Sequence, residues 1–235
     1  MIKDEKIDKE LQEAGVKFLP FVGDNYEHGI SFDEEGNLVL GTEENPGKKV
    51  LVLGESHYCD EGCCDCGNFR LHEECAEFTR NVINDYLDES KERQNWMRTF
   101  VKFERALANA DTNIDSNSIW NHLMFYNYLQ ISLCSARKVG TQADYENAIA
   151  PFYKVIEIYK PDCIMVWGRR LYNNLPTKDI KCFDLSSDIE IMEYNFEGNK
   201  IFVVPMCHPS SCFFSRDLWH NNIVVFLKNC LYGRL

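Results

Sequence analysis

Short apolar runs alternate with amphipathic segments along most of the chain. Residues 50–53 are all apolar and end at Gly54, which is typical of a strand buried on both faces of a parallel sheet. Similar runs predict strands over 123–129, 163–167, 180–185, 189–196 and 201–205. Apolar positions spaced by three and four predict helices over 71–87, 96–107, 145–159 and 217–231, with a short helix after Gly168. This alternation predicts an α/β fold, a three-layer α/β/α sandwich around a central, mostly parallel sheet.

The first 48 residues follow a different pattern. A polar helix is expected over 3–15, then a loop containing Pro20, Gly23 and Gly29, then a hairpin over 30–40 with its turn at 34–37. We therefore expect residues 1–48 to form an N-terminal appendage packed on a core domain of residues 49–235.

Composition narrows the class of protein. The 235 residues are 45% hydrophobic and 26% charged, as in globular domains that bury a sizeable core. The first ten residues are mostly charged, which excludes a secretory signal there, and Asn and Gln side chains interrupt the uncharged stretch 116–136 too often for a membrane span. Eleven cysteines without an export signal predict reduced thiols or metal ligands in a cytoplasmic protein. The net charge of −12 disfavours binding to nucleic acid by bulk electrostatics alone.

Candidate functional residues lie within or directly after four of the predicted strands. In an open α/β sheet, ligands bind outside the carboxyl ends of the strands. The segments at these ends are 54–58 (Gly-Glu-Ser-His-Tyr), Asn127, Gly168 and 208–211 (His-Pro-Ser-Ser). Each also has a purely structural interpretation: a glycine permits a tight turn, a carboxylate caps a helix, and a buried amide or loop histidine satisfies backbone groups.

Taken together and in this order, these segments resemble the uracil-DNA glycosylase superfamily. Residues 50–55 resemble its first motif, closest to the Gly-Glu-Ala-Pro-Gly form of the thermostable branch. Residues 160–168 resemble its central strand, a proline-led apolar run ending in glycine, and His208-Pro209-Ser210 is similar to its second motif. The resemblance covers residue 49 to the C-terminus.

The resemblance implies a DNA repair enzyme that binds a flipped base and hydrolyses the N-glycosidic bond of uracil or a related damaged base. Asn127 would read the base edge, and His208 would stabilise charge developing on the departing base. Glu55 and the backbone around Ser56, next to Gly54, would position the attacking water. Tyr58 or Phe69 would stack on the base, and the loop from Ser210 to Phe214 would press into the duplex.

Two positions depart from the family pattern. His57 stands where the first motif usually has proline, and Ser56 aligns with the aspartate that activates water in the best-known branch. Water activation is therefore different from that branch or absent. Likewise, either the choice of base differs or uracil is not excised.

Cysteines gather directly after the first motif. The two-residue gap between Cys63 and Cys66 is the spacing with which one loop supplies two zinc ligands, and Cys59 and Cys75 would complete a structural zinc site, with His72 or Cys64 as substitutes. No cofactor is expected for the chemistry itself. Alternatively, these thiols are small apolar groups of a reduced loop.

Two other classes of function remain open. The chain is alternatively a nucleotide or nucleic-acid binding module that keeps the fold without hydrolysis. A further alternative is a lipase-like serine esterase, in which Gly54-Glu55-Ser56 is a variant of the Gly-Asp-Ser nucleophile motif. Ser56 would then be the nucleophile and His208 the base. Those enzymes place an aspartate three residues before the histidine, where this chain has Pro205.

Overall fold

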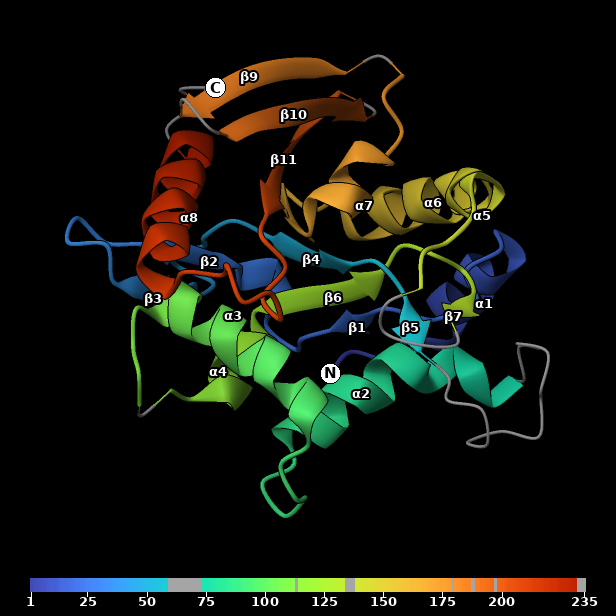
Figure 1. Cartoon of the computed structure of the whole chain (residues 1–235), viewed down its shortest axis with the longest axis horizontal. Helices are drawn as coiled ribbons and strands as arrows, with labels where there is room; N and C mark the ends of the chain where they lie inside the picture. Colours follow the sequence, from blue (N-terminus) through green and yellow to red (C-terminus); the bar gives the residue numbers. More distant parts are fainter. Residues whose placement is uncertain are drawn as a thin grey trace.

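The computed structural model describes residues 1–58, 73–112, 114–133, 138–178, 180–186, 189–196 and 198–231. A seven-stranded sheet crosses the molecule in the order β1-β6-β4-β8-β11-β10-β9 (Figure 1). Its centre consists of four parallel strands: β6 (Leu123–Asn127), β4 (Val50–Gly54), β8 (Cys163–Trp167) and β11 (Asn199–Met206). The edges are antiparallel: β1 (Phe21–Val22) pairs with β6, and β10 (Ile189–Phe196) and β9 (Lys181–Ser186) follow β11.

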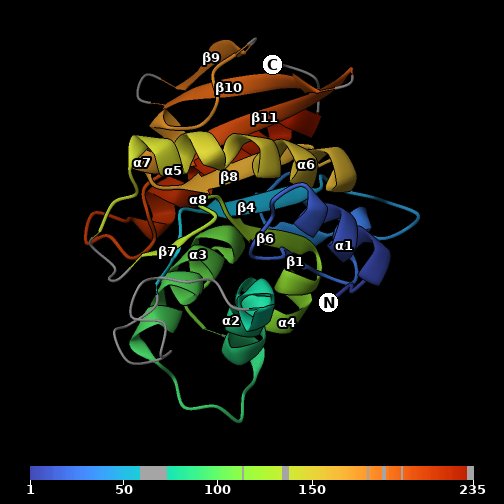
Figure 2. The same cartoon turned by 90° about the vertical axis from the view of Figure 1, so that its right-hand side faces the viewer.

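Helices cover both faces of this sheet (Figure 2). Alternate residues of β4 point to opposite faces, so that Val50 and Val52 join one apolar cluster and Leu51 and Leu53 the other. The first cluster includes residues of α2 (Phe78–Leu87), α3 (Arg98–Ala108), α4 (Ser116–Asn121) and α8 (Arg216–Leu231). The second includes residues of α1 (Glu5–Glu13), α5 (Gln142–Asn147), α6 (Ile149–Tyr159) and α7 (Arg169–Asn173). The predicted α/β class and its helix-covered, centrally parallel sheet are confirmed.

Three of the predicted helices differ from the observed ones in their boundaries. The helices predicted over 71–87 and 96–107 begin as the 3-10 turns η2 (Glu73–Glu77) and η3 (Asn95–Met97). The helix predicted over 145–159 is divided into α5 and α6. Pro151 explains this division, because its ring would clash with the carbonyl of Asn147 in a continuous helix, whereas proline is tolerated in a first turn.

Residues 1–48 contribute directly to the main sheet. Phe21 of β1 pairs with Phe125 of β6, so the N-terminal segment supplies one edge strand. It also contains the 3-10 turn η1 (Tyr26–His28) and the predicted hairpin, formed by β2 (Ile30–Phe32) and β3 (Leu38–Leu40).

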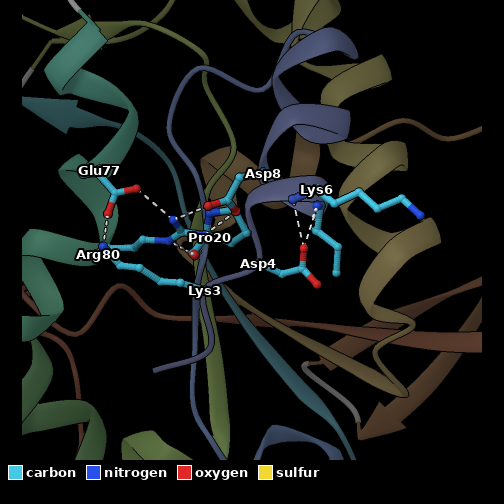
Figure 3. Close-up of polar contacts among 8 residues, drawn as sticks. Lys3, Asp4, Lys6, Asp8, Pro20, Glu77 and Arg80 are labelled. Atoms are coloured by element: carbon cyan, nitrogen blue, oxygen red, sulfur yellow. Dashed lines mark hydrogen bonds and ion pairs between the residues drawn. The ribbon is translucent and has the colours of Figure 1, made fainter.

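A buried arginine on α2 connects residues 1–48 to the helices of the first apolar cluster (Figure 3). The side chain of Arg80 on α2 is 1% exposed. It forms a two-pronged ion pair with Asp8 of α1 at 2.6 and 2.8 Å, a bond to Glu77 at 2.8 Å and a bond to the carbonyl of Pro20 at 3.1 Å. Lys3 adds an exposed ion pair to Glu77. We call these side chains the Arg80 cluster.

Within the described residues, no helix combines the length and the apolar character needed to cross a lipid bilayer.

Candidate functional site

The chain segments after β4 and β6 run side by side beyond the carboxyl edge of the sheet. The amide nitrogens of Tyr128 and Leu129 bond to the carbonyl oxygens of Gly54 and Glu55, each at 2.9 Å. Two short strands then pair in parallel, β5 (His57–Tyr58) with β7 (Ser132–Leu133). The segment 54–58 therefore lies directly beside the segment that begins at Asn127.

Gly54 and Asn127 are partners in the β4–β6 register and are in close contact. A Cβ atom at position 54 would lie 2.2 Å from Oδ1 of Asn127 and 3.1 Å from the Phe125 ring. Only glycine leaves room for the buried amide, so the requirement at this position is close approach. The structure thus brings these two predicted site residues into contact.

His57 is buried against Asn127 and held in an aromatic pocket. The amide nitrogen of Asn127 lies 3.2 Å from Nδ1 and 3.1 Å from Nε2 of the imidazole, and Thr79 Oγ1 lies 2.8 Å from Nε2. Phe78 stacks on the ring at 4.5 Å between centroids, and Phe18 meets it edge-on at 4.7 Å. Burial lowers the pKa of His57 to about 3, so the imidazole is neutral at physiological pH.

Glu55 is held by two side chains from other elements. Its carboxylate is 9% exposed and accepts hydrogen bonds from Nε of Arg170 at 2.8 and 3.1 Å, from Nη2 of the same arginine, and from the Tyr145 hydroxyl. These bonds raise the pKa of the Arg170 guanidinium, and burial together with Glu55 raises the pKa of the Tyr145 hydroxyl. Arg170 itself is 45% exposed, so the ion pair borders solvent.

His208 follows β11 and lies over Gly168. Its Cβ and Cδ2 would lie 3.8 and 3.9 Å from a Cβ atom at that glycine, and its ring meets Trp167 edge-on at 6.0 Å between centroids. The backbone N–H of Ser210 donates to Nδ1 at 3.1 Å, and the Ser210 hydroxyl lies 2.7 Å from the same atom. Burial lowers the pKa of His208, with Glu55 opposing and Arg170 reinforcing this shift.

These contacts fix the protonation of His208. A backbone N–H can only donate, so Nδ1 must accept and the proton of the neutral ring lies on Nε2. His208 therefore offers an N–H donor without carrying a positive charge.

Two buried polar atoms at the same edge have no hydrogen-bond partner in the described part of the chain. They are Oγ of Ser56, after β4, and Nε1 of Trp167, the last residue of β8. Buried polar groups are normally paired with protein or water, and an exception suggests a role toward a bound molecule.

No protein-family model matches the sequence, and no curated protein is similar to it. The chemistry of the strand-end side chains is therefore the basis for assigning a function. They combine a neutral N–H donor, an amide, a hydroxyl, an indole N–H and a half-exposed arginine.

The remaining predicted site residues are placed as follows. Tyr58 is 37% exposed on β5, and Ser210 is exposed and bonded to His208. Phe69, Cys59, Cys63 and Cys66 lie outside the described residues, as do the substitutes Cys64 and His72. Cys75 is half-buried, and the described residues contain no group of three or more His, Cys, Asp or Glu side chains able to hold a metal ion. The zinc site remains a prediction.

Four contributors to this edge were not predicted as site residues: Tyr145, Arg170, Trp167 and Thr79. The adjacent arginines at 169 and 170 give the only available signal, because a carboxylate that follows a buried strand needs a cationic partner. The other three have no distinguishing pattern, since aromatic and β-branched residues also fill apolar cores.

Proposed function

We propose that the carboxyl edge of the sheet binds a nucleobase extruded from DNA and hydrolyses its N-glycosidic bond. The observation that carries the proposal is the neutral His208 with its proton on Nε2. When the bond between the sugar and a pyrimidine breaks, its electron pair moves into the base and negative charge develops on a ring carbonyl. A preorganised neutral donor stabilises that charge without attracting the phosphate backbone.

Three neighbouring groups support this assignment. Asn127 presents an amide, which matches the adjacent acceptor and donor on a uracil edge. The unpaired hydroxyl of Ser56 is suited to hold the water that adds to the sugar carbon. That water gives its oxygen to the sugar and its proton to the released base. The proposal also includes the uracil-DNA glycosylase-like fold that the sequence motifs suggest.

The loop after His208 has the features of a duplex wedge. Phe213 is 85% exposed, and the carbonyl of Ser211 is held by Lys102 of α3 at 3.1 Å. An exposed aromatic ring on an anchored loop fits the gap that an extruded nucleotide leaves in the base stack. DNA is accordingly the proposed partner.

The test is base release from oligonucleotides that contain uracil, hypoxanthine or a thymine mismatch, measured as abasic sites. We expect release from at least one of them and a loss of about 100-fold or more in His208→Phe. His28→Gln, on turn η1, is the matched control and should retain activity. Phe213→Ala should lower release from duplex more than from single strands. Absence of release from all three substrates would contradict the proposed hydrolysis.

A second candidate is a base-binding module without hydrolysis. It is favoured by the bonds that hold both oxygens of Glu55 and by Ser56 in the place of a water-activating carboxylate. Retained binding of the oligonucleotides without abasic sites would support it. For the esterase alternative, Ser56 Oγ has no hydrogen bond to His208 or to any other described group. Ester hydrolysis abolished by Ser56→Ala would support that alternative.

A further inference from the structure

A cavity that the proposed reaction does not use lies among α2, α3 and the segment before α4. It has a volume of about 380 Å³ and shares no residue with the site at the carboxyl edge of the sheet. Three arginines line it: Arg93 in the connection between α2 and α3, and Arg98 and Arg105 on α3. We call them the cavity arginines. Cavities of this size are typical of small-molecule sites.

The backbone and one aromatic ring position the cavity arginines. Nη1 of Arg93 donates to the carbonyl oxygen of Tyr86 at 2.9 Å, and its guanidinium lies 5.3 Å from the centroid of the Tyr86 ring. The other N–H groups of this guanidinium remain available for a ligand. Arg98 and Arg105 are seven residues apart, which places them on the same face of α3 and about 10 Å apart along its axis.

Neither carboxylate that lines the cavity forms an ion pair with these arginines. Asp111 is paired with Arg216 at 2.5 Å. Glu104 is buried, and its two oxygens accept hydrogen bonds from Trp120 Nε1 at 2.5 Å and from the Ser116 hydroxyl at 2.7 Å. Burial raises the pKa of Glu104, which favours its uncharged form. In the described part of the chain, none of the cavity arginines forms an ion pair, so this cavity is a place of positive charge in a chain of net charge −12.

The cavity also has an apolar wall. Met97, which is buried, and Val101 and Ile114, which are half-buried, all line it. An inorganic anion would contact the guanidinium groups and leave this wall without a partner. A ligand that combines an anionic group with an organic part would contact both surfaces.

We propose that this cavity binds a small organic phosphate, with the phosphate on the cavity arginines and the organic part against the apolar wall. A carboxylate has two oxygens and is satisfied by one arginine, whereas a phosphate monoester presents three charged oxygens and accepts bonds from several guanidinium groups. The proposal does not depend on the proposed function, because none of its residues belongs to the carboxyl edge.

Calorimetric titration of the full chain tests the proposal with three probes: adenosine monophosphate, glucose 6-phosphate and inorganic phosphate. We expect at least one of the two organic phosphates to bind about tenfold or more tightly than inorganic phosphate. Binding of both organic phosphates no tighter than inorganic phosphate would overturn the assignment. Absence of binding by all three at millimolar concentration would also overturn it.

Substitution of the arginines locates the binding. Arg98→Gln and Arg105→Gln should each weaken the organic phosphate about tenfold or more, the effect of removing a hydrogen bond to a charged group. Arg98→Lys keeps the charge but not the planar fork, and it should also weaken binding. Lys6→Gln, at an exposed position of α1, removes one positive charge elsewhere and should leave the affinity unchanged. Equal affinity in wild type, Arg98→Gln and Arg105→Gln would refute the site.

Two further measurements need no substitution in the cavity. The Nε–H signals of the cavity arginines in ¹⁵N spectra of the wild type should shift when the organic phosphate is added, and unshifted signals would exclude the site whether or not a variant folds. A single-stranded oligonucleotide without a terminal phosphate is the other probe. If it shifts these signals while neither small phosphate does, the cavity contacts the DNA backbone and the small-ligand assignment is wrong.

Discussion

Two arginine–carboxylate pairs illustrate how similar contacts serve different purposes. In the Arg80 cluster the guanidinium is 1% exposed and bonds to two carboxylates and a backbone carbonyl. At the carboxyl edge the guanidinium of Arg170 is 45% exposed and bonds to Glu55, near buried polar atoms without partners. The first guanidinium is almost completely buried and forms four hydrogen bonds to protein groups, which is typical of a structural contact. The second borders solvent and unpaired groups, which is typical of a ligand site.

The largest expected difference between the two pairs is in stability. Asp8→Asn leaves a buried guanidinium without its two-pronged partner, and we expect a loss of about 3 kcal/mol in the free energy of unfolding. Glu55→Gln makes the same isosteric change beside an arginine that water can reach, and we expect a loss of about 1 kcal/mol. Urea unfolding of both variants measures the difference. Equal losses would show that burial does not distinguish the two pairs.

Gly54→Ala tests the packing at the carboxyl edge of the sheet, where Gly54 contacts the Asn127 amide. The added Cβ lies 2.2 Å from Oδ1 of Asn127 and must displace that buried amide, at a cost of about 2 kcal/mol. Gly140→Ala is the matched control, because its one close contact is the far end of the Leu129 side chain at 2.7 Å, whereas Asp144 and Tyr145 lie at ordinary contact distances of 3.5 and 3.6 Å. Base release should fall in the first variant and remain in the second. A wild-type midpoint of unfolding for Gly54→Ala would disprove the close approach.

Burial of His57 predicts how the free energy of unfolding depends on pH. Because the pKa of this histidine is lowered, stability falls with decreasing pH, whereas a histidine with a raised pKa loses its stabilising effect as pH increases. The pKa of His57 is about 3 in the folded protein and near 6.5 when unfolded, so acid favours the unfolded chain. The contribution of the neutral His57 to the free energy of unfolding is fully present above about pH 6.5. It declines as pH falls and is lost below about pH 3. We expect His57 to add up to about 1.4 kcal/mol per pH unit to the slope in this window. His57→Gln should reduce that slope in urea unfolding between pH 4 and 7; an unchanged slope would exclude a buried neutral imidazole.

The smallest effect is expected at the exposed rim of the Arg80 cluster. Lys3 bonds to Glu77 at 2.6 Å, but its side chain is 55% exposed. Lys3→Ala should cost less than about 0.5 kcal/mol, and the difference should disappear in high salt. Thermal unfolding at two salt concentrations tests this expectation. A loss comparable to that of Asp8→Asn would place Lys3 inside the cooperative part of the cluster.

The sequence predicted the sheet well because its strands are encoded locally. Residues 50–53 and 163–167 are apolar on both faces, and such runs have few alternatives. The edge strand β1 was not foreseen, since two residues carry no periodic signal and their pairing with β6 depends on a distant segment. The boundaries of α5 and α6 were missed because the apolar spacing continues through the break.

For the site, strand ends indicated where polar residues gather but not how they are paired. Glu55 and His208 were predicted from their positions after buried strands, and Asn127 from its position within one. Arg170 reaches Glu55 from a helix, and Trp167 meets His208 from the end of another strand, so only the fold brings these partners together. Hydrogen-bond direction, which decides the tautomer of His208, is likewise a property of three-dimensional contacts.

The antiparallel pairing of Phe21 with Phe125 also has a consequence for biosynthesis. On a ribosome the first of these residues emerges long before its partner, so the N-terminal segment must wait, unpaired, until β6 has been translated. During that interval Phe18, Leu19 and Phe21 have no sheet to cover them. Nascent chains arrested before residue 123 should therefore bind chaperones more strongly than chains released after β6.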